Sequence, residues 1–160
     1  MSDADAWGYA RALHVLGVVL WIGGVAMVTT VLLPAARKSL EGDPVAGFER
    51  LEHRFAAQSR WTTLLVGATG FYLVHSFGLW HRFGELRYWW MSAMVLVWAI
   101  FTLMLFVIEP FVLHRAGPGR AKDGAVGALR TMAIMHWILL ALSLATIAGA
   151  VMGSHGVFLF

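Results

Sequence analysis

The sequence of 160 residues contains no cysteine and few charged residues. Without cysteine, the chain can form no disulfide, no thiolate metal site and no cysteine-ligated iron–sulfur cluster. Charged residues make up 13% of the chain, whereas a soluble domain carries about 25%. Because so little polar surface cannot cover a globule in water, the composition excludes an ordinary soluble domain.

The sequence also lacks a concentrated charge of either sign. The formal net charge is only +3, and the basic residues lie between apolar runs. A nucleic-acid-binding protein usually gathers its basic residues in one patch or along one element, so we expect no nucleic-acid partner. The first ten residues, MSDADAWGYA, have no basic segment ahead of an apolar one, so we expect no cleavable signal peptide.

What the chain has instead is long apolar runs. Four runs, at about 12–36, 61–80, 88–110 and 131–153, approach or exceed the roughly 20 residues that a helix needs to cross a bilayer. The connections between them are short, which favours antiparallel neighbours in a bundle. We therefore predict an all-α fold, a single transmembrane domain over residues 1–160 that forms a four-helix antiparallel bundle in the lipid bilayer. An amphipathic helical segment is expected at about 44–58.

Lysine and arginine predict the orientation of the bundle. Nine of the 12 basic residues lie in the first and third connections or at their edges, and three lie in the N-terminal tail and the second connection. Basic connections stay in the cytoplasm. This asymmetry predicts a multi-pass protein of the cell inner (cytoplasmic) membrane with both termini in the periplasm. Tryptophans near the span ends predict an aromatic belt at the two interfaces; these are Trp7, Trp61, Trp80, Trp89 and Trp90.

Three histidines lie within the apolar runs. They are His14, His75 and His136, and four more, His53, His81, His114 and His155, lie near span ends. An ionisable residue in a transmembrane helix usually faces the interior of the bundle. Because the first two helices run in opposite directions, we expect His14 and His75 toward the periplasmic side and His136 toward the cytoplasmic side.

The segment LHVLGVVLWIGG places His14 on a stripe of small and aromatic residues. His14, Gly17, Trp21 and Gly24 follow one another at helical spacing and share a face. Membrane haem b needs an axial imidazole with space beside it for a flat ring, and glycine provides that space. This pattern predicts haem b held by His14 and His75, with Gly17, Trp21 and Gly24 beside it and a second site at His136.

Two other interpretations remain open at this point. Copper is the first, because methionine is abundant, with eight residues, and its thioether combined with histidine suits copper(I); Met91 and Met94 lie close together in the third run. A structural subunit is the second, because glycines in membrane helices commonly serve helix packing. Its histidines would then be hydrogen-bonded to neighbouring helices.

The segments ALHVLGVVLWIGG and FERLEHRFAAQSRWTTLLVGATGFYLV resemble two groups of membrane proteins. One is the copper resistance protein D family, and the other is the HemJ-type protoporphyrinogen oxidases, which are small four-helix haem b proteins. The resemblance covers about residues 10–75 and implies a haem or copper function through His14. The third run, WWMSAMVLVWAIFTLMLF, lacks the lysine that HemJ-type proteins carry there.

These observations together predict a haem b-binding membrane protein with a redox or electron-transfer role. A quinone or a redox partner protein would exchange the electrons, and any enzymatic activity would be that of a haem-dependent membrane oxidoreductase. Whether one or two haems bind, and whether the chain forms a homo-oligomer, stays open in the sequence.

Overall fold

The computed structural model describes residues 3–38, 44–108 and 122–159, and over 36–38, 44–56 and 122–129 it describes only the backbone. All regular secondary structure in these ranges is helical. This confirms the all-α class that the apolar runs predicted.

The first long rod consists of three consecutive helices. They are α1 (Asp3–Met27), the π-helix η1 (Val28–Leu32) and α2 (Leu33–Lys38). Two features explain the π-helical turn. Pro34 has no N–H to donate within the ladder, and the Thr29 hydroxyl donates to the carbonyl oxygen four residues earlier at 2.6 Å. Both weaken the regular backbone hydrogen bonds of the α-helix, and the chain forms a π-helical turn at this point.

The second rod is one uninterrupted helix, α3 (Pro44–Ser76). Proline suits the first helical position because no N–H is needed there. The helix stops before Gly78, which adopts a left-handed conformation with φ of 62°. A 3₁₀ helix, η2 (Leu79–Gly84), follows. The apolar run at 61–80 is therefore the second half of α3 together with the turn that ends it.

The third and fourth rods complete the molecule. The third joins the 3₁₀ helix η3 (Leu86–Tyr88), α4 (Trp89–Leu103) and the π-helix η4 (Met104–Ile108). The fourth is α6 (Lys122–Ser154), which begins before the apolar run at 131–153.

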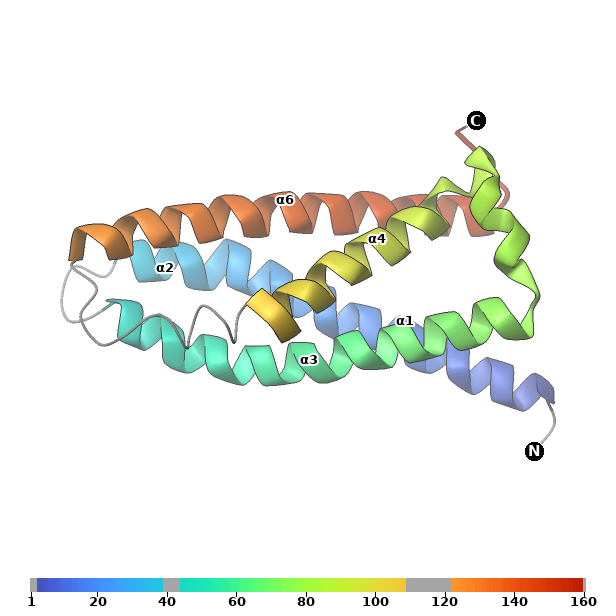
Figure 1. Cartoon of the computed structure of the whole chain (residues 1–160), viewed down its shortest axis with the longest axis horizontal. Helices are drawn as coiled ribbons and strands as arrows, with labels where there is room; N and C mark the ends of the chain where they lie inside the picture. The colour runs from blue at the N-terminus through green and yellow to red at the C-terminus, as the bar shows by residue number, and fades with distance from the viewer. Residues whose placement is uncertain (1–2, 39–43, 109–121, 160) are drawn as a thin grey trace.

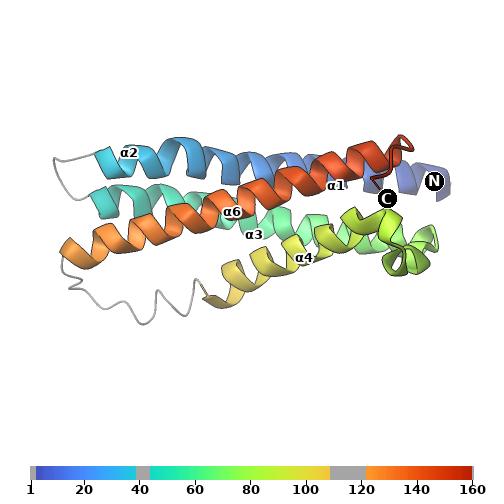
Figure 2. The same cartoon turned by 90° about the horizontal axis from the view of Figure 1, so that it is seen from above.

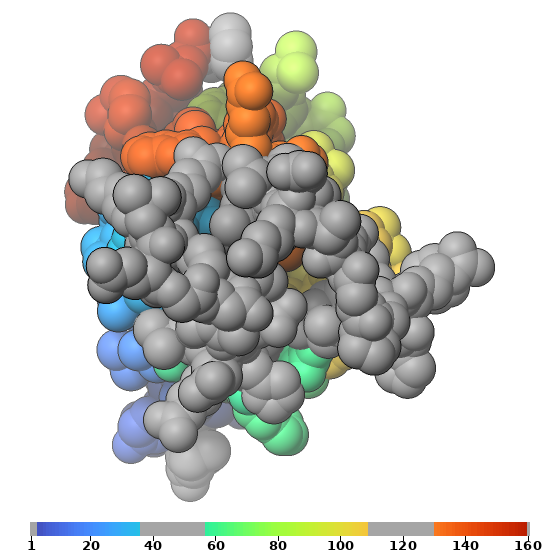
Figure 3. All heavy atoms as spheres, turned by 90° about the vertical axis from the view of Figure 1, so that its left-hand side faces the viewer, coloured from blue at the N-terminus to red at the C-terminus, as the bar shows by residue number. Residues whose placement is uncertain are grey.

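The four rods lie side by side and alternate in direction, and both ends of the chain lie at the same end of the molecule (Figure 1). The closest pair is α1 with α3, and α4 packs mainly on α6. Figure 2 shows that α4 starts beside α6 and moves away from it along its length. Viewed from the opposite end, α6 lies above, with the first rod on one side and α4 on the other (Figure 3).

Three helical stretches of the described chain are long and apolar enough to cross a membrane. They are Asp3–Ala35, Leu86–Ile108 and Arg130–Ser154. The described part of α3 is not among them, because every stretch of 18 residues within 57–76 contains Arg60 besides several threonines and glycines.

All four rods contribute to one core. Its buried residues include Trp21 from α1, Val66 from α3, Phe101 from α4 and Leu139 from α6. The Trp21 and Phe101 rings meet edge to face, with centroids 4.8 Å apart. A smaller cluster at the end of the molecule opposite the termini joins the first rod to α6.

Candidate functional site around His14

The stripe predicted from the first apolar run lies on the inner face of α1. Gly17 and Trp21 are buried, and His14 and Gly24 are half-buried. The helical spacing thus correctly indicated which side of α1 faces its neighbours. What lies opposite the stripe determines whether these residues hold a ligand or another helix.

The His14 imidazole bridges α1 and α3. Its Nδ1 lies 3.1 Å from the carbonyl oxygen of Val66 and 3.1 Å from the hydroxyl oxygen of Thr69. A carbonyl oxygen can only accept, so Nδ1 carries the hydrogen. The Thr69 hydroxyl donates its own hydrogen to the Leu65 carbonyl at 2.6 Å, so its oxygen is free to accept. The tautomer is therefore fixed, and Nε2 keeps its lone pair.

The hollows beside this histidine are filled by α3 itself. A Cβ atom at Gly17 would lie 2.9 Å from the side chain of Val66, and one at Gly70 would lie 3.0 Å from Cε1 of His14. Gly17 thus allows α1 and α3 to approach closely, and Gly70 makes room for the imidazole. The stripe is a helix-packing surface in this structure.

Three tryptophan rings fill three further glycine hollows. The Trp98 ring packs on Gly67, the Trp89 ring on Gly149, and the Trp90 ring on Gly153. The Trp98 indole N–H also donates to the Thr63 carbonyl at 2.9 Å. Trp89 and Trp90 therefore serve helix packing, whereas Trp61 and Trp80 are exposed. The interfacial belt stays a prediction.

His75 lies away from the His14 site. It follows Gly70, the residue that faces His14, by five positions, which is roughly 7.5 Å along the helix and 140° around it. Its side chain is exposed. The structure thus does not bring the two predicted axial ligands together, because His75 points away from the side of α3 that faces His14.

His136 repeats the hydrogen-bond pattern of His14 within a single helix. Its Nδ1 donates to the carbonyl oxygen of Met132, one turn earlier in α6, at 2.9 Å. The side chain is half-buried, and both Met132 and the neighbouring Ala133 pack in the smaller cluster with the first rod. The free lone pair is again on Nε2.

His14 and His136 lie at different depths. The smaller cluster places Ala133 of α6 level with Val28 of the first rod. Because α1 and α6 are antiparallel, His136 is level with position 25 of α1. That is 11 residues from His14, or about 16 Å along the bundle at 1.5 Å per residue. The expected separation of the two histidines into different layers agrees with this register.

The remaining histidines have local roles or fall outside the described region. His81 bonds to the Gly78 carbonyl and His155 to the Val151 carbonyl, each near the end of its helix. His114, and the side chain of His53, lie outside the described residues. Of the two methionines considered for copper, Met91 is buried and Met94 is half-buried.

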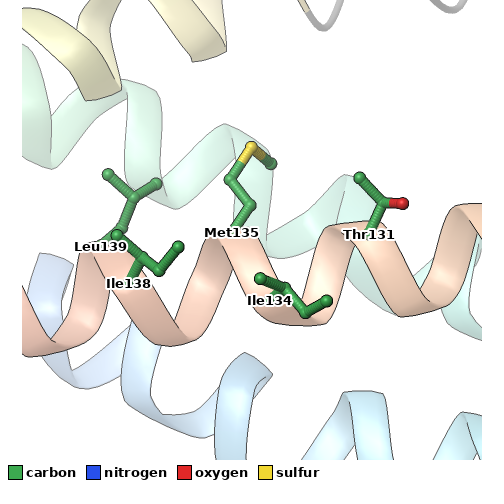
Figure 4. Close-up of a pocket in the computed structure, with 5 residues that line it drawn as sticks. All are labelled: Thr131, Ile134, Met135, Ile138 and Leu139. Atoms are coloured by element: carbon green, nitrogen blue, oxygen red, sulfur yellow. The ribbon is translucent and has the colours of Figure 1, made fainter.

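A shallow apolar pocket of about 280 Å³ lies on α6, away from His14. Figure 4 shows its five lining side chains along one stretch of that helix: Thr131, Ile134, Met135, Ile138 and Leu139. The same face of α6 meets α4 at Gly149. At the pocket, however, the third rod sits on α3, where the Arg60 Nε donates to the Leu105 carbonyl at 3.4 Å. Among the described residues, this divergence leaves the pocket face of α6 without a helix packed on it.

Within the described ranges, no three His, Asp or Glu side chains come together as metal ligands would. What the site offers is single imidazoles with an oriented ring and an Nε2 lone pair. Sequence reasoning missed Thr69 and the Val66 carbonyl, the groups that orient His14. No sequence signal marks them, because their part depends on the register between α1 and α3.

No protein-family model, curated protein or solved structure matches the chain. The resemblance to copper resistance protein D and to HemJ-type oxidases therefore stays a prediction.

Proposed function

We propose that this chain is an integral membrane protein of the cell inner membrane, with four antiparallel helices and both termini in the periplasm. Three of its rods are long and apolar enough to cross a bilayer. Large apolar side chains cover the outer surface of the first of them, including Val15, Leu16, Val19 and Leu20, each more than half exposed. A continuous exposed apolar surface of this kind is what lipid contact requires. The less apolar α3 is stabilised in the membrane by its packing against α1.

We further propose that the protein binds haem b through His14 and has a redox or electron-transfer role. The observation that carries this proposal is the pair of hydrogen bonds at the His14 Nδ1. Histidines that bind metal commonly donate the other ring N–H to a carbonyl or hydroxyl oxygen, which fixes the tautomer and the ring orientation. His14 thus offers an oriented Nε2 to iron. Haem, when bound, supplies one-electron chemistry, with a quinone or a partner protein as its donor or acceptor.

The His14 imidazole fits haem b, but the space beside it does not. The imidazole is suitable as one axial ligand. The space beside it is taken by Val66 at Gly17, and His75 does not face it. His14 would therefore hold haem through its Nε2 atom alone, without a contribution from the α1–α3 contact at Gly17.

The test is the visible spectrum of the purified protein reconstituted with haem. We expect a Soret band that is lost in His14→Ala. His75→Ala should keep the band, because its side chain lies elsewhere. Thr69→Val keeps the Nε2 ligand but removes one bond to Nδ1, so it should retain the haem with shifted bands. A His14→Ala spectrum identical to that of the unaltered protein would refute the assignment.

Copper(I) binding at His136 is a second candidate, favoured by one observation. His136 and Met132 lie one turn apart on α6, and the bond between them leaves the His136 Nε2 free. Imidazole and thioether are ligands that copper(I) accepts. Bound copper without a Soret band, lost in both His136→Ala and Met132→Leu, would support this candidate. If neither signal appears, the histidines serve only the packing of a structural subunit.

A further inference from the structure

Hydroxyl groups in the described helices usually bond to their own helix. Seven of them donate to the carbonyl oxygen four residues earlier at 2.6–3.0 Å: those of Thr29, Thr30, Thr62, Thr69, Thr102, Ser143 and Thr146. Thr63 differs. Its residue is fully buried, and its Oγ1 has no hydrogen-bond partner in the structure. A buried hydroxyl that does not bond to the carbonyl oxygen of its own helix can form a hydrogen bond with another group.

Trp21 presents a second polar atom of the same kind. The residue is 4% exposed, and its indole Nε1 is buried without a hydrogen-bond partner. The indole nitrogen can only donate. Leaving such a donor unpaired in a core costs free energy, and native proteins rarely do so.

The register of α1 and α3 places these two groups at one level. His14 lies against Gly70, and Gly17 lies against Val66. Because the helices are antiparallel, four residues further along α1 correspond to about four residues back along α3. Trp21 is therefore level with Thr62 and Thr63, and of these two hydroxyls that of Thr62 bonds within its helix whereas that of Thr63 has no partner.

Neighbouring contacts place both groups toward the middle of the bundle. Trp98 of α4 bonds to the backbone carbonyl of Thr63, and Phe101, one turn later, meets the Trp21 ring. On α3, Thr63 lies between the face that meets α1, at Val66, and the face that meets α4, at Gly67. Its side chain thus belongs to the same layer of the core as Trp21.

We propose that Trp21 and Thr63 form a binding site for one hydrogen-bond-acceptor oxygen at the centre of the bundle. The indole N–H and the hydroxyl both donate to that oxygen. A buried water can supply it, since buried waters typically satisfy such groups. The carbonyl of a lipid-soluble guest such as a quinone offers the same chemistry. Leu139, which packs in the same core cluster as Trp21, also lines the apolar pocket on α6, so an apolar guest has a neighbouring space for its body.

The first test uses the sign of a stability change in the detergent-solubilised full chain. If the Thr63 hydroxyl holds an oxygen, Thr63→Val leaves the Trp21 N–H poorly paired and lowers the Tm, by about 2–4 °C for a chain of this size. Thr62→Val is the matched control. It is the buried neighbour, its hydroxyl bonds within the helix, and its Tm should change little. A Thr63→Val protein with an unchanged or higher Tm would overturn the proposal, because removing a truly unpaired hydroxyl costs nothing.

A double-mutant cycle tests whether the two groups share one guest. The decreases in Tm caused by Trp21→Phe and by Thr63→Val should not add up in the double variant. Either substitution alone already weakens the binding of the shared oxygen, so the second substitution has less left to remove. Fully additive shifts in Tm would mean that the groups act separately and would overturn the shared site.

A spectroscopic test identifies the oxygen. In ¹⁵N-labelled protein, the Trp21 indole proton should show a nuclear Overhauser effect to water, or its chemical shift should move when decylubiquinone is added. The first result identifies water and the second identifies a guest carbonyl. The Trp98 indole, bonded to the Thr63 carbonyl, is the internal reference and should respond to neither. Absence of both effects at Trp21 would refute the site. The result does not depend on haem or copper binding.

Discussion

At the end of the molecule that carries both termini, bulky rings fill glycine hollows. Trp89 and Trp90 of α4 pack on two glycines of α6, and the His14 ring of α1 packs on Gly70 of α3. Further from the termini, the π-helix η1 separates α1 from α2, and the π-helix η4 follows α4. The third rod leaves α6 there, and a pocket of about 280 Å³ remains.

The difference shows that the tightly packed contacts and the pocket occupy different parts of the bundle. A ring in a glycine hollow fixes both the distance and the register of two helices, because neither surface can slide without a clash. Where such rings are missing, helices can diverge and leave apolar surface for a guest. The sequence suggested a ligand at the glycine stripe near His14. The described residues instead form a pocket on α6, around Met135 and Ile138.

The largest expected effect concerns which end faces the cytoplasm. Nine of the 12 basic residues lie in the first and third connections or at their edges, and basic connections stay in the cytoplasm. A reporter enzyme that is active only in the cytoplasm, fused after Phe160, should therefore be inactive. The same reporter placed at 118, in the connection before α6, should be active. The reverse pattern would invert the orientation of the bundle and exchange the depths of His14 and His136.

The next effect concerns the filled glycine hollows. A Cβ atom at Gly67 would lie 2.6 Å from the Trp98 ring, so Gly67→Ala must displace that ring or separate the helices. Overpacking of this kind costs about 1–3 kcal/mol. At Gly23 a Cβ would meet no other part of the described structure within 4 Å, so Gly23→Ala should be neutral or slightly stabilising. Thermal unfolding in detergent measures both, and equal effects would contradict the packing described.

The smallest effect compares the two half-buried histidines in the haem-free protein. His14 bonds from one helix to another, whereas His136 bonds within its own helix. Removing an interhelical bond should lower the free energy of unfolding by about 1 kcal/mol. His14→Ala should therefore reduce the Tm more than His136→Ala does. If His136→Ala is the more damaging change, its contacts with the first rod matter more than its hydrogen bond indicates.

The helical class could be predicted because the sequence contains apolar runs of membrane-spanning length. Apolar runs long enough to span a bilayer must be helical, since backbone groups have no other partners in lipid. The spacing of His14, Gly17 and Trp21 correctly indicated the inner face of α1. The extension of α6 back to Lys122 could not be predicted in the same way, because residues 122–130 form no apolar run.

The sequence by itself determined the helical class, the apolar runs and the inward direction of the α1 stripe, because these depend on local composition and on helical period. Only the tertiary structure decided what each inward residue meets. The register between antiparallel helices places Gly70 and not His75 opposite His14, and it puts Thr63 level with Trp21. A shift of one residue turns a helix by about 100°, so partners across a bundle depend on packing that no single helix encodes.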